Sequence, residues 1–175
     1  MGWTPTLNGV YQSIPTWVVG QVSVATDWNN YVAGNMNFLA SPPMFRVYRS
    51  ASYTAISANP VPWDTVLFDT AGGYSTQNFK YTVMYAGLYL CGMGVNQVGV
   101  SDSGYLNIWM YRTGTDFCYQ YGTGFGNAGN AGFLIQGSTV CAVGDTLYGA
   151  FNASASLAET TGPTQNFMYG VKISN

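Results

Sequence analysis

Residues 80–102, KYTVMYAGLYLCGMGVNQVGVSD, contain twenty-one consecutive residues without a formal charge, between Lys80 and Asp102. This run is long enough for a transmembrane helix, which needs about 20 mostly apolar residues. Its glycines and its aromatic and β-branched residues, however, favour strands over helices. Alternate residues from Tyr89 to Val95 would share one face, and the residues between them are leucine or glycine. The run therefore predicts a strand buried on both sides in a soluble sandwich, not a membrane span.

Segments of the same character surround this run from residue 44 onward, and close spacing and Gly-rich turns mark about nine or ten short strands. The strand-like segments are MFRVYRSASYTAI, VPWDTVLFDT, NFKYTVM, AGLYLCGMGV, GYLNIWMYR, DFCYQYG, GFLIQGSTVCAV, DTLYGAFNAS and QNFMYGVKIS. No helical pattern separates them, which is typical of an antiparallel sandwich or jelly roll. We therefore expect an all-β jelly-roll domain over residues 44–175 and a separate N-terminal region over residues 1–43.

The N-terminal region predicts an extended arm followed by one short helix. Residues 1–24 are rich in turn formers, and a helix over residues 27–40 would end before Pro42 and Pro43. Five apolar residues fall on one face of that helix: Trp28, Tyr31, Val32, Met36 and Leu39. This stripe would pack either on its own domain or on the helices of other copies in a short stalk.

Composition limits the partners. The chain has 175 residues, of which 47% are hydrophobic and only 7% are charged, against roughly 25% charged residues in ordinary soluble domains. So little charge beside so much apolar surface favours an oligomer. Five scattered basic residues and a net charge of −2 offer no electrostatic footprint for nucleic acid. The N-terminus also lacks the basic residues and continuous apolar core of a secretory signal.

Residue types exclude most catalytic and metal sites. The chain has no histidine, which removes His-based triads and zinc sites, and no Cys-x-x-Cys pair. Its three cysteines predict free, buried thiols. Asp64 and Asp69, five residues apart, would face opposite sides of a strand, and with Asp145 they are expected to bind local backbone N–H groups. We expect no enzyme activity, no cofactor and no metal.

A long glycine-rich connection, GTGFGNAGNAGF at residues 122–133, has aromatic residues around it. Such a loop either packs its own aromatic rings or contacts a ligand such as a sugar at the exposed end of the sandwich. The candidate ligand contacts of this outer loop are Tyr119, Tyr121, Phe125, Asn127 and Asn130.

Several of these segments resemble a known family. VPWDTVLFDT, GGY, FKYTVMYAGLYL, VGDTLYGAF and NFMYGVKIS are similar to the C1q and tumour-necrosis-factor type jelly roll, in the form encoded by tailed phages of actinobacteria. Upstream, TWVVGQVSVATDWNNYVAGNMNFLASPP resembles the arm and helix that often precede this jelly roll in phage virion proteins. The chain departs from that pattern at Ala33-Gly34, where such proteins usually carry an Arg-Asp pair.

The resemblance implies a homotrimer that is part of a virion and is made in the cytoplasm of a bacterial host. Its arm and helix would attach to the major capsid protein or another virion protein through seven apolar residues: Trp3, Trp17, Trp28, Tyr31, Val32, Phe38 and Leu39. A capsid decoration or head-fibre protein is the first expectation. The alternatives are a minor tail or baseplate protein that binds the host surface, and a carbohydrate-binding module that recognises a host glycan. Neither nucleic acid nor a membrane is an expected partner.

Overall fold

The computed structural model describes residues 25–27, 32–51, 57–100, 104–123, 129–154 and 163–174. It contains two short helices, α1 (Ala25–Asp27) and α2 (Gly34–Ala40). The strands are β1 (Met44–Tyr48), β2 (Ser57–Ala58), β3 (Thr65–Asp69), β4 (Tyr74–Ser75), β5 (Lys80–Thr82), β6 (Gly87–Val100), β7 (Tyr105–Arg112), β8 (Thr115–Thr123), β9 (Gly129–Cys141), β10 (Thr146–Ala153) and β11 (Phe167–Ser174).

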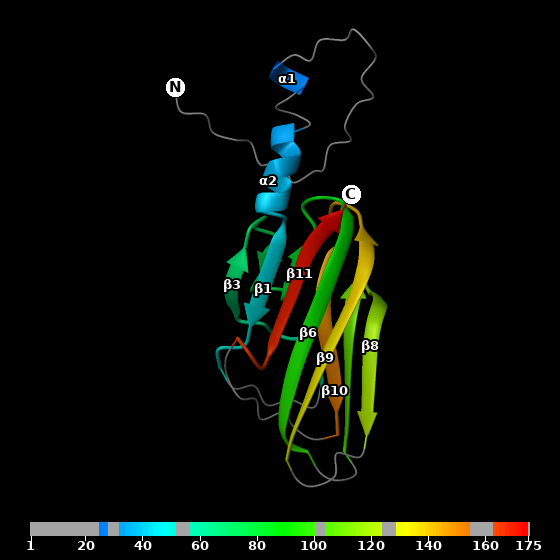
Figure 1. Cartoon of the computed structure of the whole chain (residues 1–175). Helices are drawn as coiled ribbons and strands as arrows, with labels where there is room; N and C mark the ends of the chain where they lie inside the picture. Colours follow the sequence, from blue (N-terminus) through cyan, green and yellow to red (C-terminus); the bar gives the residue numbers. More distant parts are fainter. Residues whose placement is uncertain are drawn as a thin grey trace.

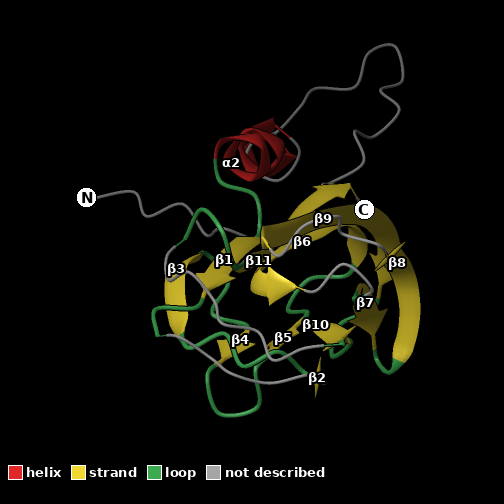
Figure 2. Cartoon of the chain, turned by 90° about the horizontal axis from the view of Figure 1, so that it is seen from below, coloured by secondary structure: helices red, strands yellow, loops and turns green. Residues whose placement is uncertain are grey.

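These strands form two facing antiparallel sheets. The first sheet has the order β3-β1-β11-β6-β9. The second has the order β4-β5-β10-β7-β8, with β2 paired to β10. Seen end-on, the two sheets enclose a common interior, and the first sheet faces the reader in the side view (Figures 1 and 2). The predicted antiparallel jelly-roll sandwich is confirmed.

The uncharged run at residues 80–102 supplies two strands, β5 and β6, separated by a turn. On β6, alternate residues from Tyr89 to Val95 are buried in the core as expected. Leu88 and Leu90, on the other side, are partly exposed. The prediction of burial on both sides is therefore wrong for that part of β6, because this side is the outer surface of the first sheet.

Stacked aromatic rings form the centre of the core. The rings of Phe45 and Tyr81 stack with centroids 4.1 Å apart, and Tyr89 packs beside Tyr81 at 6.4 Å. Trp63 is also fully buried. Aromatic side chains bury large areas, so they fill the gap between the sheets with few residues.

Helix α2 stands on the end of the first sheet, directly before β1 (Figure 1). It ends at Ala40, before Pro42, and so confirms the C-terminal part of the predicted helix; α1 begins at Ala25, two residues before the predicted start. Phe38 is buried, and its ring lies 5.3 Å from Nζ of the buried Lys172, whose pKa is lowered by burial. This contact joins α2 to the end of β11.

The exposed side of α2 carries Met36 and Leu39, three positions apart. Both belong to the apolar stripe expected from the sequence, so this part of the stripe does not pack on its own domain. Residues 28–31, which include Trp28 and Tyr31, and the arm at residues 1–24 lie outside the described residues. No helix in the described part of the chain is both long and apolar enough to cross a membrane. The division into an arm over residues 1–43 and a domain over 44–175 stays a prediction.

Candidate functional site

Asp64, Asp69 and Asp145 accept hydrogen bonds from local backbone N–H groups, as predicted. Asp64 accepts hydrogen bonds from the Ser50 N–H at 2.8 Å and the Thr65 hydroxyl at 2.9 Å, and it lies 3.7 Å from the Arg49 guanidinium. Burial alone would raise the pKa of Asp64, but these partners outweigh it and lower the pKa below its usual value. A carboxylate held charged in this way is a structural anchor and a poor proton donor.

Asp69 and Asp145 hold turns in the same way. Asp69 accepts three backbone N–H bonds at 2.8–3.2 Å, from Ala71, Gly72 and Tyr74, and so orders the turn after β3. Asp145 accepts one from Ala142 at 2.9 Å in the turn between β9 and β10. These three aspartates are therefore occupied by local backbone and side-chain donors.

The cysteines are free thiols. Cys91 and Cys141 are buried as predicted, and burial raises the pKa of Cys141 to about 11. Cys118 is partly exposed, contrary to the prediction, because it lies on the edge strand β8, where its thiol donates to the Gln136 carbonyl at 3.3 Å. Within the described ranges, no group of three or more Cys, Asp or Glu side chains could hold a metal ion.

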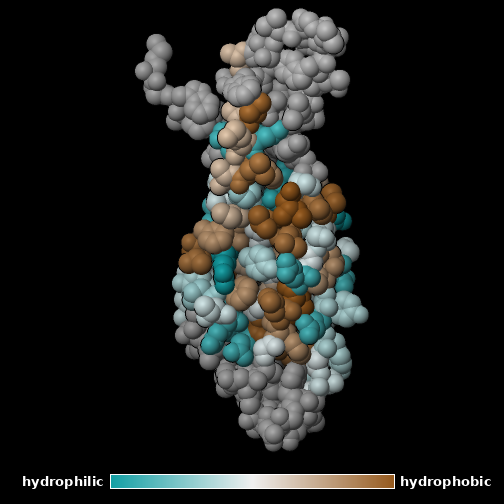
Figure 3. Space-filling view, viewed as in Figure 1, coloured by the Kyte–Doolittle hydropathy of each residue, from teal (hydrophilic) through white to brown (hydrophobic). Residues whose placement is uncertain are grey.

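The outer surface of the first sheet is the most conspicuous feature of the chain. Hydrophobic side chains gather across the middle of this surface (Figure 3). The pairing of β1, β11, β6 and β9 places a set of large apolar residues on it: Met44, Leu88, Leu90, Leu134, Val140, Phe167, Tyr169 and Val171. We call this set, with the neighbouring Phe68 of β3, the apolar face. Leu134 is 59% exposed and Val140 66%, although both are in regular strands.

Two glycines of β6 seat the aromatic rings of the apolar face. Gly92 pairs with Tyr169 and Gly94 with Phe167. A Cβ built on Gly92 would lie 2.5 Å from the Tyr169 ring, and one on Gly94 would lie 2.8 Å from the Phe167 ring. Both rings therefore lie flat across β6, where any side chain would lift them. The glycines in the middle of the uncharged run have this role.

Arg46 is the charged residue among these rings. Its guanidinium donates to the Pro163 carbonyl at 2.7 Å and lies 4.5 Å from the centre of the Phe167 ring. A guanidinium held against an aromatic face keeps its apolar stem and flat surface on the sheet. Arg46 thus adds contact area to the apolar face as well as charge.

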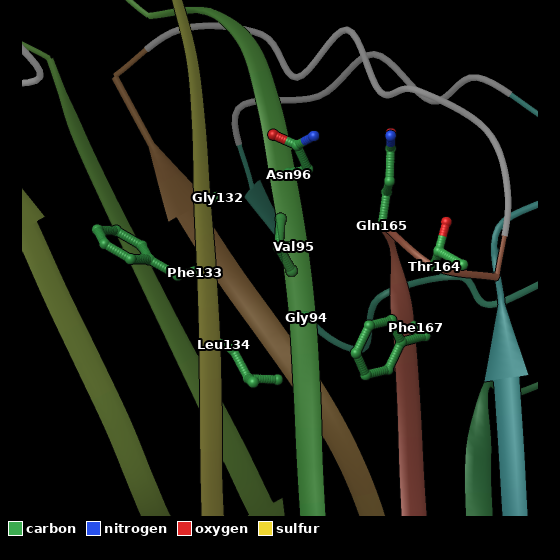
Figure 4. Close-up of a pocket in the computed structure, with 9 residues that line it drawn as sticks. All are labelled: Gly94, Val95, Asn96, Gly132, Phe133, Leu134, Thr164, Gln165 and Phe167. Carbon is green, nitrogen blue, oxygen red and sulfur yellow. The ribbon is translucent and has the colours of Figure 1, made fainter.

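Two hollows run along the apolar face. One, of about 440 Å³, lies among Phe68, Leu134, Tyr169 and their neighbours. The second, of about 380 Å³, shares Leu134 and Phe167 with the first, and Figure 4 shows these two side chains on either side of Gly94. Asn96, Thr164 and Gln165 give the second hollow a polar end. The shared residues make the two hollows one groove with an apolar floor.

The second sheet has a different outer surface. Asp116, Thr123, Thr146 and Ala150 are among the residues on that side. The other outward-facing residues of β7, β8 and β10 are aromatic or carry amides: Tyr105, Asn107, Trp109, Tyr111, Tyr119, Tyr121, Tyr148 and Asn152. We call this set the tyrosine face. Tyr119 and Tyr121, two of the expected ligand contacts of the outer loop, lie within β8, in the predicted strand segment DFCYQYG beside that loop.

Few of the other sequence-predicted site residues can be placed. Val32 is partly buried, Phe38 is buried within its own chain and Leu39 is exposed. Asn130 lies in β9, where its backbone pairs with Val98, and its side chain is outside the described part. Trp3, Trp17, Phe125 and Asn127 also lie outside the described residues, as do Trp28 and Tyr31.

The sequence analysis missed the apolar face. On β11, large side chains at Phe167, Tyr169 and Val171 alternate with Met168, Gly170 and Lys172. Because glycine and lysine are common on exposed surfaces, the sequence suggests that Gly170 and Lys172 lie on the outer side of β11. In the structure they lie on the buried side, and Phe167 and Tyr169 lie on the outer side. One signal in the sequence could have revealed the apolar face. Both sides of β6, β9 and β11 carry apolar residues, although only one side of each strand can face the core.

No protein-family profile matches the chain, and no curated protein matches it in sequence. Solved structures do match the fold. A crystal structure of murine APRIL at pH 5.0 aligns with a TM-score of 0.55 and 16% identity, over 75% of this chain and 98% of that one. The globular domain of zebrafish complement 1qA protein aligns with a TM-score of 0.52 and 16% identity, over 76% and 98%. These similarities give the chain a jelly roll of the C1q/TNF type.

Proposed function

We propose that this chain is a non-enzymatic structural protein of a phage particle, in which three copies associate through their apolar faces. The observation that carries the proposal is the apolar face itself. It extends over regular strands, interrupted by Arg46, Gln136 and Ser138, and it lies on a chain with very little charge. Exposed apolar patches of this kind typically mark interaction sites, since water contact costs about 25 cal/mol per Å².

A ring of copies fits the distribution of apolar residues better than a two-fold dimer. The edge strand β3 carries two further exposed apolar residues, Val66 and Leu67, beside Phe68 of the apolar face. The face of one copy can thus cover the edge of the next, which is a heterologous contact that closes into a ring. Three members agree with the family resemblance read from the sequence.

The virion role is supported by the resemblance over the arm and helix. Helix α2 extends away from the jelly roll and leaves Met36 and Leu39 open. In a trimer, three such helices would come from the same end and could pair as a stalk, with the arm residues Trp3 and Trp17 available for attachment. We assign the anchor to the capsid, as a decoration or head-fibre protein.

Two measurements test the proposal at separate levels. Light scattering at micromolar concentration should give three times the 18.8 kDa chain mass. A monomer mass would contradict the trimer. Gold-labelled antibody against the protein should then decorate phage heads in electron micrographs, whereas label confined to the tail end would move the assignment to host attachment, and absence of label would contradict the virion role.

A further inference from the structure

Cross-strand pairing arranges the tyrosine face in rows. Trp109 lies opposite Tyr119, and in the next row Asn107 lies between Tyr121 and Asn152. Side chains of directly paired residues are about 5 Å apart, and rows on one face follow each other every second residue, at roughly 7 Å. Flat rings and side-chain amides thus alternate on a short, continuous strip.

The strip is exposed to solvent, and its aromatic rings are held in place by neighbouring side chains. Tyr119 is 66% exposed and Tyr121 62%, the highest exposures among the described aromatic residues of the core strands. One row further along, Tyr111 and Tyr148 stack with centroids 5.1 Å apart, and Lys80 Nζ lies 4.5 Å from the Tyr148 ring. Tyrosine and tryptophan also have few rotatable bonds, so a ligand that contacts them loses little side-chain entropy.

The chemistry of the strip differs from that of the apolar face. Most outward positions of the second sheet on β7, β8 and β10 carry tyrosine, tryptophan or asparagine. The exceptions in these strands are the exposed Asp116 and Thr123 at the two ends of β8, Thr146 and the buried Ala150. Tyrosine and tryptophan are also common at protein interfaces, but the larger apolar surface for protein contacts is on the opposite sheet. Stacked nucleic-acid bases would suit the rings, but their phosphates need cations along the strip, and no Lys or Arg lies in the Trp109 and Asn107 rows.

We infer that the tyrosine face binds a neutral polysaccharide. Aromatic rings present an apolar surface to the C–H faces of sugar rings, and each asparagine amide both donates to and accepts from sugar hydroxyls. Asn107 Oδ1 is covered and has no hydrogen-bond partner in the described part of the chain, so a small rotation toward a hydroxyl would satisfy it. Trp109, Tyr119 and Tyr121 provide stacking, and Asn107 and Asn152 read hydroxyls.

This site is independent of the proposed assembly. It lies on the second sheet, whereas the apolar face is on the first, so a single copy carries a complete site. Association through the apolar faces would leave the tyrosine faces outward and multiply them, which raises the avidity for a polymer.

Affinity electrophoresis of the full chain tests the inference. Native gels are cast with one of four neutral polymers (galactan, mannan, dextran or hydroxyethylcellulose) or with polygalacturonate as the charged control. At least one neutral polymer should retard the protein. The double variant Tyr119→Ala/Tyr121→Ala should bind that polymer at least about tenfold more weakly, because it removes two large apolar contact surfaces of the site. Thr115→Ala, an exposed change at the start of β8, should leave binding unchanged.

Each other outcome overturns the inference. These outcomes are no retardation by any neutral polymer, equal retardation of the double variant, retardation by polygalacturonate alone, and tighter binding of a single-stranded oligonucleotide that the double variant also loses. Both tyrosines are mostly exposed, so the double variant should fold, and circular dichroism checks this. Asn107→Ala gives a second test that keeps the rings and removes the central amide.

Discussion

Glycines in the strands of this protein keep space for aromatic rings, and Gly170 is the clearest case in the core. A Cβ there would lie 2.5 Å from the Phe45 ring and 3.3 Å from the Cys91 sulfur. Phe45 cannot retreat easily because it is stacked on Tyr81. We expect Gly170→Ala to lower the free energy of unfolding by about 1–3 kcal/mol, as overpacked cores do.

Urea denaturation measures this effect, and Gly132→Ala is the matched control. Gly132 is also in a strand of the first sheet, but a Cβ on Gly132 would lie 3.6 Å from its nearest neighbour, an ordinary contact. Equal stability of the two variants would show that the Phe45 ring has room to move.

The charge of Asp64 gives the fold a dependence on acid. Because the pKa of Asp64 is lower in the folded chain than in the unfolded one, its contribution to stability is present above the unfolded value of about 3.9 and is lost as the pH falls through the folded value. Asp64→Asn should therefore cost about 1 kcal/mol at pH 7 and progressively less below pH 4.

Thermal melts of both proteins between pH 2.5 and 7 would measure that difference. Asp116→Asn, at an exposed position of β8, is the control and should follow the parent protein across the range. A gap between parent and Asp64→Asn that stays constant with pH would contradict the assigned role of the carboxylate.

At the scale of elements, helix α2 buries two side chains, Asn35 and Phe38, of which Phe38 is the apolar one. Phe38 is buried against the domain and meets Lys172, whereas Leu39 beside it is 75% exposed. Phe38→Ala should release α2 with a loss of roughly 2 kcal/mol of docking energy and little change in the melting of the jelly roll. Leu39→Ala should leave the docking unchanged.

Hydrogen exchange of residues 34–40 measures the docking directly. Faster exchange in Phe38→Ala than in Leu39→Ala is the expected result. The same exchange in both would mean that α2 is held by contacts other than the Phe38 ring.

The sequence predicts where the strands of this protein lie better than it predicts which side of each strand faces the core. Alternation in AGLYLCGMGV and GYLNIWMYR and turn signals such as the one after Asp69 locate the strands, because these are local properties of the chain. Which phase faces inward depends on the partner strand. Gly170 and Lys172 point inward only because Phe45 and the end of the sandwich receive them, and Tyr119 stays in a strand because Trp109 pairs with it.

At the scale of the whole molecule, two sheets of similar build carry opposite surfaces. The first presents leucine, valine and phenylalanine, and the second presents tyrosine and asparagine. Because the chain has so few charges, the difference between these two outer surfaces determines which partners each sheet can contact. The first sheet has a surface suited to other copies of the chain, and the second has one that can stay in water.

The proposed assembly should be sensitive to one charge added on the first sheet. Leu134 lies where the two hollows meet and is 59% exposed in the single chain, so Leu134→Arg should cost the monomer little. In the proposed trimer, the new guanidinium would be buried without a partner, a cost of several kcal/mol that each interface repeats. We expect the variant to be monomeric in light scattering at concentrations where the parent is trimeric.

Val143→Arg is the matched control for this change. Val143 is equally apolar and 66% exposed, but it lies in the turn between β9 and β10, away from the groove. The Val143→Arg variant should form the same oligomer as the parent protein, because a guanidinium in this turn stays in water. Dissociation of both variants would mean that added positive charge alone separates the copies, and a trimeric Leu134→Arg would move the interface off the apolar face.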